Sequence, residues 1–178
     1  ALMVAIHYEY TEMAGKILDA GASVHARDNQ DNTALVWCGY KGHSGIALRL
    51  LRAGARIDEC NSLGRSMLTQ AAAKGHDDFL RALIAAGVDA NHIDKRGETP
   101  LTAAAAAHQV TTVKTLIDAG ADPEKPDRSG RTAAAIAQEK NLPRLAAAIE
   151  GEIRRKKKKA FADDLRQITE GARGDITL

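Results

Sequence analysis

The residues of this chain that could carry chemistry are six histidines, two cysteines and the adjacent aspartates Asp77 and Asp78. Histidine and cysteine at suitable spacing bind metals or act in nucleophilic catalysis, and paired carboxylates act as general acid and base. The spacings that such chemistry needs are not present, because the sequence contains no HExxH, no GxSxG and no glycine-rich phosphate loop. We therefore expect no catalytic residue, no metal site and no cofactor, and we predict that the protein is not an enzyme.

The positions of these residues favour structural roles instead. His43 and His76 occupy equivalent places in a repeated pattern, and the adjacent aspartates open an apolar segment, where carboxylates stabilise the start of a helix. Cys38 lies within an apolar segment and we expect it to be buried, whereas Cys60 lies in a predicted loop and we expect it to be exposed. A regulatory thiol at Cys60 is the reactive group that this interpretation leaves open.

The composition bounds the fold and the location. The 178 residues form one domain or one short repeat array, with 44% hydrophobic but only 3% aromatic residues, so the core must consist mainly of alanine, leucine, isoleucine and valine. The formal net charge of +2 indicates no particular partner, and no run of 18 apolar residues occurs. Because the cysteines form no metal or disulfide pattern, we expect a cytoplasmic protein. A periplasmic or secreted location stays open, because the chain begins at Ala1 and not at a methionine.

An internal period of 33 residues organises the chain. Glycines recur at this spacing after apolar segments, at Gly21, Gly54, Gly87 and Gly120. Threonine or serine recurs at Thr33, Ser66, Thr99 and Thr132, and leucine at Leu2, Leu35, Leu68 and Leu101. Aspartate or asparagine recurs at Asp28, Asn61, Asp94 and Asp127. This many positions at one spacing identify a tandem repeat.

Each unit is predicted to be a turn followed by two helices. The turn combines aspartate or asparagine with a nearby glycine. A threonine then caps a short alanine-rich helix, and Pro100 stands where the first helical turn has no N–H to lose. A second helix, such as residues 77–87, carries Phe79 and Leu83 at helical spacing and ends at a glycine.

These features resemble the ankyrin repeat family, on the segments GETPLTAAAAA and GHDDFLRALIAAGVDAN and on the 33-residue period. The resemblance covers about residues 1–150 and predicts an all-α solenoid of helix-turn-helix units with short hairpin loops and an extra C-terminal helix. Five units are expected, at about 1–27, 28–60, 61–93, 94–126 and 127–150, followed by a basic helix and tail over 151–178. The last unit is degenerate, as terminal units often are. The family's usual histidine is replaced by Met3, Val36, Thr69 and Thr102, and we expect this loss of a hydrogen-bonding ring to lower stability.

The alanine run Ala103 to Ala107 then has a structural explanation. Ankyrin-like stacking brings the first helices of successive units close together, and small side chains permit that approach. We expect Ala106 and Ala107 to face the groove.

The resemblance also implies where a partner binds, since ankyrin-like units use their loop tips and the exposed edge of the first helix. Carried over position by position, it predicts these contact residues: Tyr8, Arg27, Tyr40, Lys41, Leu63, Arg65, Lys74, Ile93, Lys95, Arg96, Arg128 and Arg131. This face is basic, although residues 1–151 as a whole carry 17 basic and 18 acidic residues. We therefore expect a protein partner with an acidic surface. Leu63 and Ile93 are expected to form one small apolar patch, and Trp37 is assigned to the core.

The tail has a different composition. Six consecutive basic residues begin it: Arg154, Arg155, Lys156, Lys157, Lys158 and Lys159. A helix is predicted from about Pro143 to Glu170, with Phe161, Leu165 and Ile168 docking on the array or on a partner. The main hypothesis is a non-catalytic scaffold that binds a protein in the groove, as inhibitor or anchor. The alternative is a nucleic-acid or acidic-membrane adaptor that works through the basic run. The sequence leaves the oligomeric state open.

Overall fold

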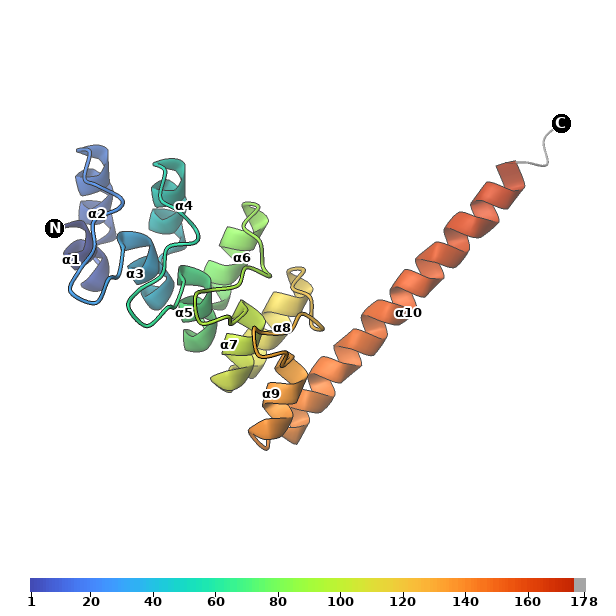
Figure 1. The fold of residues 1–178 in the computed structure, drawn as a ribbon. Helices are drawn as coiled ribbons and strands as arrows, with labels where there is room; N and C mark the ends of the chain where they lie inside the picture. Colours follow the sequence, from blue (N-terminus) through green and yellow to red (C-terminus); the bar gives the residue numbers. More distant parts are fainter. Residues whose placement is uncertain (175–178) are drawn as a thin grey trace.

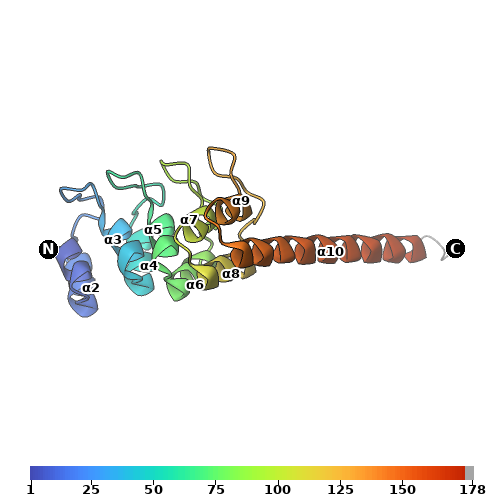
Figure 2. The same ribbon diagram turned by 90° about the horizontal axis from the view of Figure 1, so that it is seen from below.

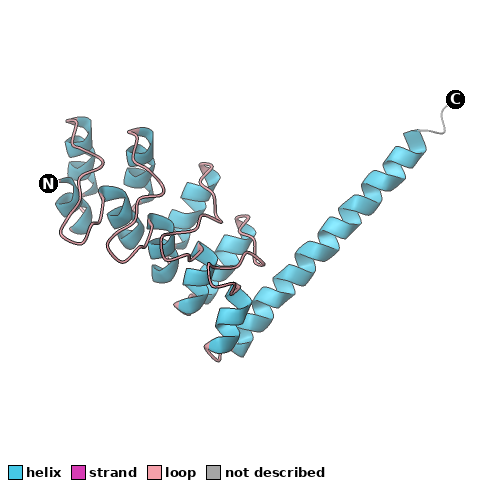
Figure 3. Ribbon diagram, viewed as in Figure 1, coloured by secondary structure: helices cyan, strands magenta, loops and turns pink. Residues whose placement is uncertain are grey.

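A computed structural model shows an array of paired helices that continues into one long helix (Figures 1 and 3). It describes residues 1–174, with side chains as far as residue 167. Within this range the helices are α1 (Leu2–His7), α2 (Thr11–Asp19), α3 (Ala34–Lys41), α4 (Ser44–Arg52), α5 (Met67–Lys74), α6 (Asp77–Ala85), α7 (Pro100–Ala106), α8 (Val110–Asp118), α9 (Ala133–Glu139) and α10 (Pro143–Gly174). The predicted all-α solenoid with a C-terminal helix is confirmed.

The helices form two rows. The first helix of each unit (α1, α3, α5, α7 and α9) is here called the inner helix, and the second (α2, α4, α6, α8 and the first turns of α10) the outer helix. Each outer helix is joined to the next inner helix by a hairpin loop, and Figure 2 shows these loops projecting in one row on the same side of the array. Contacts between equivalent helices of successive units hold the rows together.

The inner helices α3, α5, α7 and α9 begin at a capping side chain, as the repeated threonine predicts, whereas α1 begins at Ala1 without one. The hydroxyl of Thr99 accepts a hydrogen bond from the backbone N–H of Thr102 at 3.1 Å, and Thr33, Ser66 and Thr132 act in the same way. Thr102 returns the bond, because its hydroxyl accepts from the backbone N–H of Thr99 at 2.8 Å. Thr69 completes the same capping box in α5 and also donates to Asp94 at 2.8 Å. Hydrogen bonding is therefore retained at the family's histidine position in these two units.

The hairpin loops are closed by the repeated aspartate or asparagine. Oδ1 of Asp94 accepts from the backbone N–H groups of Arg96 and Glu98, both at 3.0 Å. Asp28, Asn61 and Asp127 make the same two bonds in their own loops. Successive loops are also bonded to each other, since the backbone N–H of Lys95 donates to the carbonyl of Gly64 at 3.1 Å. The loops therefore form a continuous edge of the array.

The core runs along the whole array between the two rows. Leucines at the repeated inner-helix position are buried, and so are Phe79, Leu80 and Leu83 of α6. Ala103, Ala104 and Ala105 are also buried, and α7 packs between α5 and α9. These small side chains allow the inner helices to approach closely, as the alanine run predicts.

A close approach of backbone to backbone lies between α3 and α5. A methyl group at Gly39 would lie 2.2 Å from the carbonyl oxygen of Met67, a backbone atom of the next unit. Such a contact cannot be relieved by turning a side chain. Gly39 therefore sets the distance between the second and third units.

The expectation that Cys60 is exposed is wrong. Its side chain is only 2% exposed, because Cys60 forms a β-bridge with Ser66 at the base of the hairpin and lies under the neighbouring loop. Burial raises the pKa of the Cys60 thiol, and that of the buried Cys38 thiol, above the ordinary value. Neither cysteine has the low pKa and exposure that a reactive thiol needs.

Replacing Gly39 by alanine tests the close approach. We expect Gly39→Ala to lower the free energy of unfolding by about 2–3 kcal/mol, because backbone must move to admit the methyl group. Gly45→Ala is the matched control: Gly45 is an exposed helical glycine with open space around its Cβ position, so we expect a gain of about 0.5 kcal/mol. Urea denaturation measures both values. Equal effects at the two positions would contradict the packing argument.

The hairpin of the last unit predicts a dependence of stability on pH. Burial tends to raise the pKa of Asp127, but hydrogen bonds from the backbone and guanidinium of Arg131 outweigh it, so the pKa lies below the ordinary value. The unfolded chain thus binds this proton more tightly than the folded protein, and the stabilisation present at neutral pH is lost as the pH falls through the ordinary aspartate range.

We expect Asp127→Asn to be less stable than the wild type at pH 7 and to lose less stability between pH 7 and pH 3. Asparagine keeps the turn, as Asn61 shows, but gives up the charge. Urea denaturation at both pH values tests this. If Asp127→Asn and the wild type lose the same free energy of unfolding between pH 7 and pH 3, Asp127 is not a source of the acid sensitivity.

Candidate functional site

Aromatic side chains gather at one end of the inner-helix row. Five rings from α1, the turn after it and α3 form what is here called the aromatic cluster: His7, Tyr8, Tyr10, Trp37 and Tyr40. The Trp37 ring lies edge-to-face against His7 at 4.9 Å and against Tyr40 at 5.6 Å, between ring centroids. Tyr8 packs edge-to-face on His7 and stacks at 6.2 Å on Tyr10. Because the rings contact one another, they form a continuous surface across the first two units.

Hydrogen bonding fixes the centre of this cluster. The indole Nε1 of Trp37 donates to Oδ2 of Asp28 at 2.8 Å, and Asn32 donates to the same carboxylate. Burial tends to raise the pKa of Asp28, but the hydrogen bonds from Asn32 and Trp37 outweigh it and hold the pKa below the ordinary value. The carboxylate therefore stays ionised at neutral pH and continues to accept the indole proton.

Trp37 was assigned to the core, and this is only partly correct. Its half-buried ring packs against the core but also joins His7 to Tyr40 on the exposed face. The repeat register contains a signal for this, since His7 and Tyr40 occupy the same position in successive units. A large ring between them on α3 is placed to contact both.

Two predicted contact lysines lie beside the cluster. The ammonium of Lys74 on α5 lies 4.5 Å from the centroid of the Tyr40 ring, a cation–π distance, and extends the cluster into the third unit. The ammonium of Lys41 lies 3.6 Å from the carboxylate of Glu9. Lys41 is therefore paired with a carboxylate, whereas Lys74 places its positive charge against the exposed Tyr40 ring.

The third and fourth units present a shallow hollow instead of aromatic rings. It has a volume of about 150 Å³ and is lined by Arg65, Thr69, Ala73, Arg96, Glu98, Ala103, Ala106 and Ala107. Ala106 and Ala107 thus lie on this face, as expected. The inner helices thus contribute four alanines and Thr69 to the hollow, and its charged side chains come from the hairpin tips.

Several predicted basic contacts are engaged within the protein. Arg131 forms an ion pair with Asp127 at 2.9 Å, and Arg96 forms one with Glu98 at 3.2 Å. These acidic neighbours make the tips less positive than the sequence alone suggests.

Two other arginines bind backbone carbonyls. Arg27 donates to the carbonyls of Asp31 and Cys60 at 2.9 and 3.1 Å, and Arg128 donates to that of Lys95 at 3.1 Å. Both side chains therefore link neighbouring hairpin loops. Lys95 itself is exposed at a loop tip.

Both predicted apolar tip residues are exposed. Leu63 is 66% exposed and Ile93 38% exposed. Their association into one patch stays a prediction.

The basic run lies on α10, where part of it is held against the array. Arg155 forms an ion pair with Asp118 at 3.4 Å, Lys157 pairs with Glu124 at 2.9 Å, and Lys156 donates to the carbonyl of Ala121 at 3.1 Å. All three acceptors belong to the end of α8 and the loop after it. These contacts fix the direction in which α10 leaves the array.

Beyond this point α10 projects away from the repeats (Figure 1). Phe161 is 63% exposed and Leu165 47% exposed, so of the two expected alternatives docking on the array is wrong and docking on a partner stays a prediction. The helix is straight and extends past the fourth unit, which puts these residues out of reach of the repeats. The Ile168 side chain lies outside the described residues.

Among the described residues, no group of three or more histidine, cysteine, aspartate or glutamate side chains is placed to hold a metal ion. No described helix is both long and apolar enough to cross a membrane.

Comparison with known families bears on this arrangement. The family model for "Ankyrin repeats (3 copies)" matches residues 35–127 and 68–150, and the model for "Ankyrin repeat" matches residues 1–29. A comparison with curated proteins gives no match. The two family matches cover both the aromatic cluster and the alanine-lined hollow, and together more than half of the chain. The chain therefore belongs to the ankyrin repeat family.

Proposed function

We propose that the inner-helix face binds an acidic segment of a protein partner, with the aromatic cluster as its anchor. Ankyrin repeats generally mediate protein–protein interaction and are generally non-catalytic. The inner-helix face is here the exposed side of the inner helices together with the hairpin tips. A cytoplasmic scaffold of this kind acts by inhibiting or anchoring its partner.

The observation that carries the proposal is the exposure of the aromatic cluster. The chain has only three tyrosines, one tryptophan and two phenylalanines, and the cluster contains every tyrosine and the tryptophan. Tyr8 is 61% and Tyr40 38% exposed, although core packing does not require either ring at the surface. Tyrosine and tryptophan dominate the energetic centres of protein interfaces, because their large rigid rings bury much area at little entropic cost.

Charge favours an acidic partner. Lys74 adjoins the cluster, and Arg65 lines the hollow beside it. Lys95 extends this positive surface at the next loop tip. An acidic segment laid across the inner helices meets these cations beside the rings that contact its apolar residues. Such charges mainly raise the association rate and select the partner.

The basic run on α10 supports the alternative function less well. Arg155, Lys156 and Lys157 already bind groups of the fourth unit, so nucleic acid or an acidic membrane would have to compete for them. Lys158 and Lys159 are exposed. Binding through this run stays a prediction.

The test is a nuclease-treated affinity capture from source extract with three variants. Tyr8→Ala with Tyr40→Ala removes two exposed rings, and we expect at least about a tenfold loss of the captured protein. Arg65→Glu with Lys95→Glu is expected to weaken capture most strongly at low salt, because screening already reduces the attraction at high salt. Arg52→Glu with Arg81→Glu is the matched control, since these exposed arginines lie on outer helices.

Circular dichroism and thermal melting establish that each variant is folded before capture is compared. A partner that both inner-face variants capture as well as the wild type would overturn the proposal. Capture that disappears with nuclease, or with Lys158→Glu and Lys159→Glu alone, would assign the binding to the basic run.

A further inference from the structure

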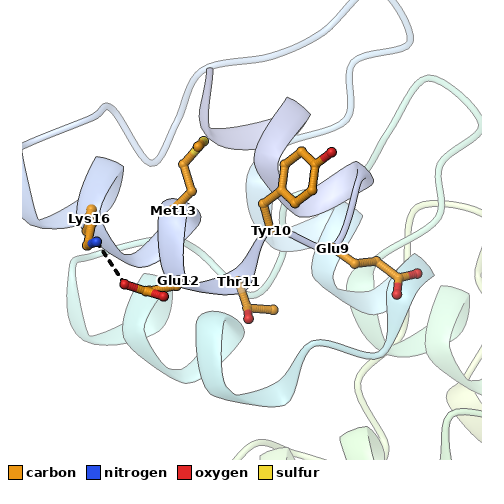
Figure 4. A pocket seen from close by; sticks show the side chains of 6 residues that line it. All are labelled: Glu9, Tyr10, Thr11, Glu12, Met13 and Lys16. Atoms are coloured by element: carbon orange, nitrogen blue, oxygen red, sulfur yellow. Dashed lines mark ion pairs between the residues drawn. The ribbon is translucent and has the colours of Figure 1, made fainter.

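The first unit exposes apolar side chains at its outer end. Val4 of α1 is 57% exposed, Tyr10 58% and Met13 of α2 55%, and Ile17 is half-buried. Figure 4 shows Tyr10 and Met13 beside Glu9, Glu12 and Lys16, where these residues line a hollow of about 440 Å³. The exposed or half-buried residues Val4, Tyr10, Met13, Lys16 and Ile17 of the first unit are here called the amino-terminal face.

The same positions are buried in the later units. The position of Met13 is occupied by Ile46, Phe79, Thr112 and Leu145, which are 7%, 1%, 1% and 3% exposed. The position of Ile17 is occupied by Leu50, Leu83, Leu116 and Ile149, which are fully buried. Val4 corresponds to Gln70, Ala103 and Ile136, each at most 6% exposed, and to the half-buried Trp37. The first unit thus carries the sequence of an internal unit at positions that are covered elsewhere.

Specific contacts show what covers these positions. Thr112, at the position of Met13, donates to Asp77 of the preceding unit at 2.6 Å. Gln109, at the position of Tyr10, donates to the carbonyl of Ala73 in the preceding unit at 3.3 Å.

The position of Lys16 is also used in a later unit to contact the unit before it. It is occupied in the second unit by Arg49, whose guanidinium binds Asp19 and the carbonyl of Gly15 in the first unit. Three positions of the amino-terminal face are therefore those that later units use to contact the unit before them.

The hollow has a counterpart one unit further on. The residues Gly42, His43, Ser44, Gly45, Ile46 and Arg49 line a hollow at the same six positions, and Thr11 of the preceding unit completes its wall. In the first unit no such wall is present among the described residues.

The other end of the array is built differently. The exposed side chains from the end of α9 to the first turns of α10 are polar or small: Gln138, Glu139, Lys140, Asn141, Pro143, Arg144, Ala147 and Ala148. A terminal unit that faces water needs such an outer surface. The last unit has it, and the first unit does not.

We propose that the amino-terminal face is an interface that takes a further helix-turn-helix unit of the same 33-residue type, joined to α1 through a hairpin loop. This unit continues the interface that already links the first unit to the second. Its inner helix packs against Val4 and its outer helix covers Met13 and Ile17, while Lys16 reaches an acidic side chain or carbonyl of its outer helix, as Arg49 does one unit later.

The chain itself supplies a unit with which to test the proposal. Residues 34–66 form one full period that ends with the capping Ser66, so their sequence placed directly before Ala1 restores the register and gives α1 a capping side chain. We expect this extended protein to melt at least about 5 °C higher than the original chain.

Thiol reactivity shows whether the added unit covers the face. Cys38 and Cys60 are both buried, so a new surface cysteine is the accessible one. We expect Met13→Cys to react with a thiol reagent at least tenfold more slowly in the extended protein. Glu12→Cys is the matched control and should react equally in both, because its position is exposed in all five units.

A second extension with residues 67–99, which end with the capping Thr99, keeps the test valid if the first unit fails to fold. Undiminished reactivity of Met13→Cys in both extended proteins would overturn the proposal. Sedimentation velocity of the original chain provides the other test. A dimer that Met13→Glu dissociates would assign the face to a second copy of the chain and would also overturn it.

Discussion

The contact between successive units is the constraint on which the rest of the structure depends. No unit buries all of its apolar surface by itself: each inner helix packs on the outer helix of its own unit and on the inner helices of the neighbouring units. Gly39 shows how tight this requirement is, because even a methyl group there would meet backbone of the next unit. Small residues in the inner helices therefore reflect the spacing of the stack. They leave the outward sides of the same helices free to vary.

Because the packed sides of the inner helices are fixed and only their outward sides vary, the candidate site is a surface and not a cavity. The stack fixes the helices and hairpin loops, and each unit then contributes a few outward residues in a regular order. In the first two units these are aromatic rings joined by edge-to-face contacts, and in the next two they are alanines bordered by tip cations. A partner that spans the array thus meets apolar surface first and a shallow charged hollow beside it. Asp28 connects the scaffold to the site, since it closes a hairpin loop and also holds Trp37 in the aromatic cluster.

The two ends of the array show the same constraint from opposite sides. At the last unit, α10 supplies both the outer helix and the polar surface, and its basic residues bind the end of α8. At the first unit, apolar residues occupy positions that have a covering neighbour everywhere else. The asymmetry follows from the physics of stacking, because an interface position loses its burial when no unit lies against it.

The sequence alone determined the fold, because a 33-residue period with capping threonines, turn aspartates and terminal glycines is local information repeated along the chain. The predicted contact residues Tyr8, Tyr40 and Leu63 are exposed, and their role in binding stays a prediction. Tertiary structure decided what depends on neighbours from other units. Cys60 is buried by an adjacent loop, Trp37 reaches a ring of the first unit, and Arg155 and Lys157 of α10 pair with acidic residues of the fourth unit. Such contacts join residues about one period apart, and the period fixes their positions but not the direction in which each long side chain turns.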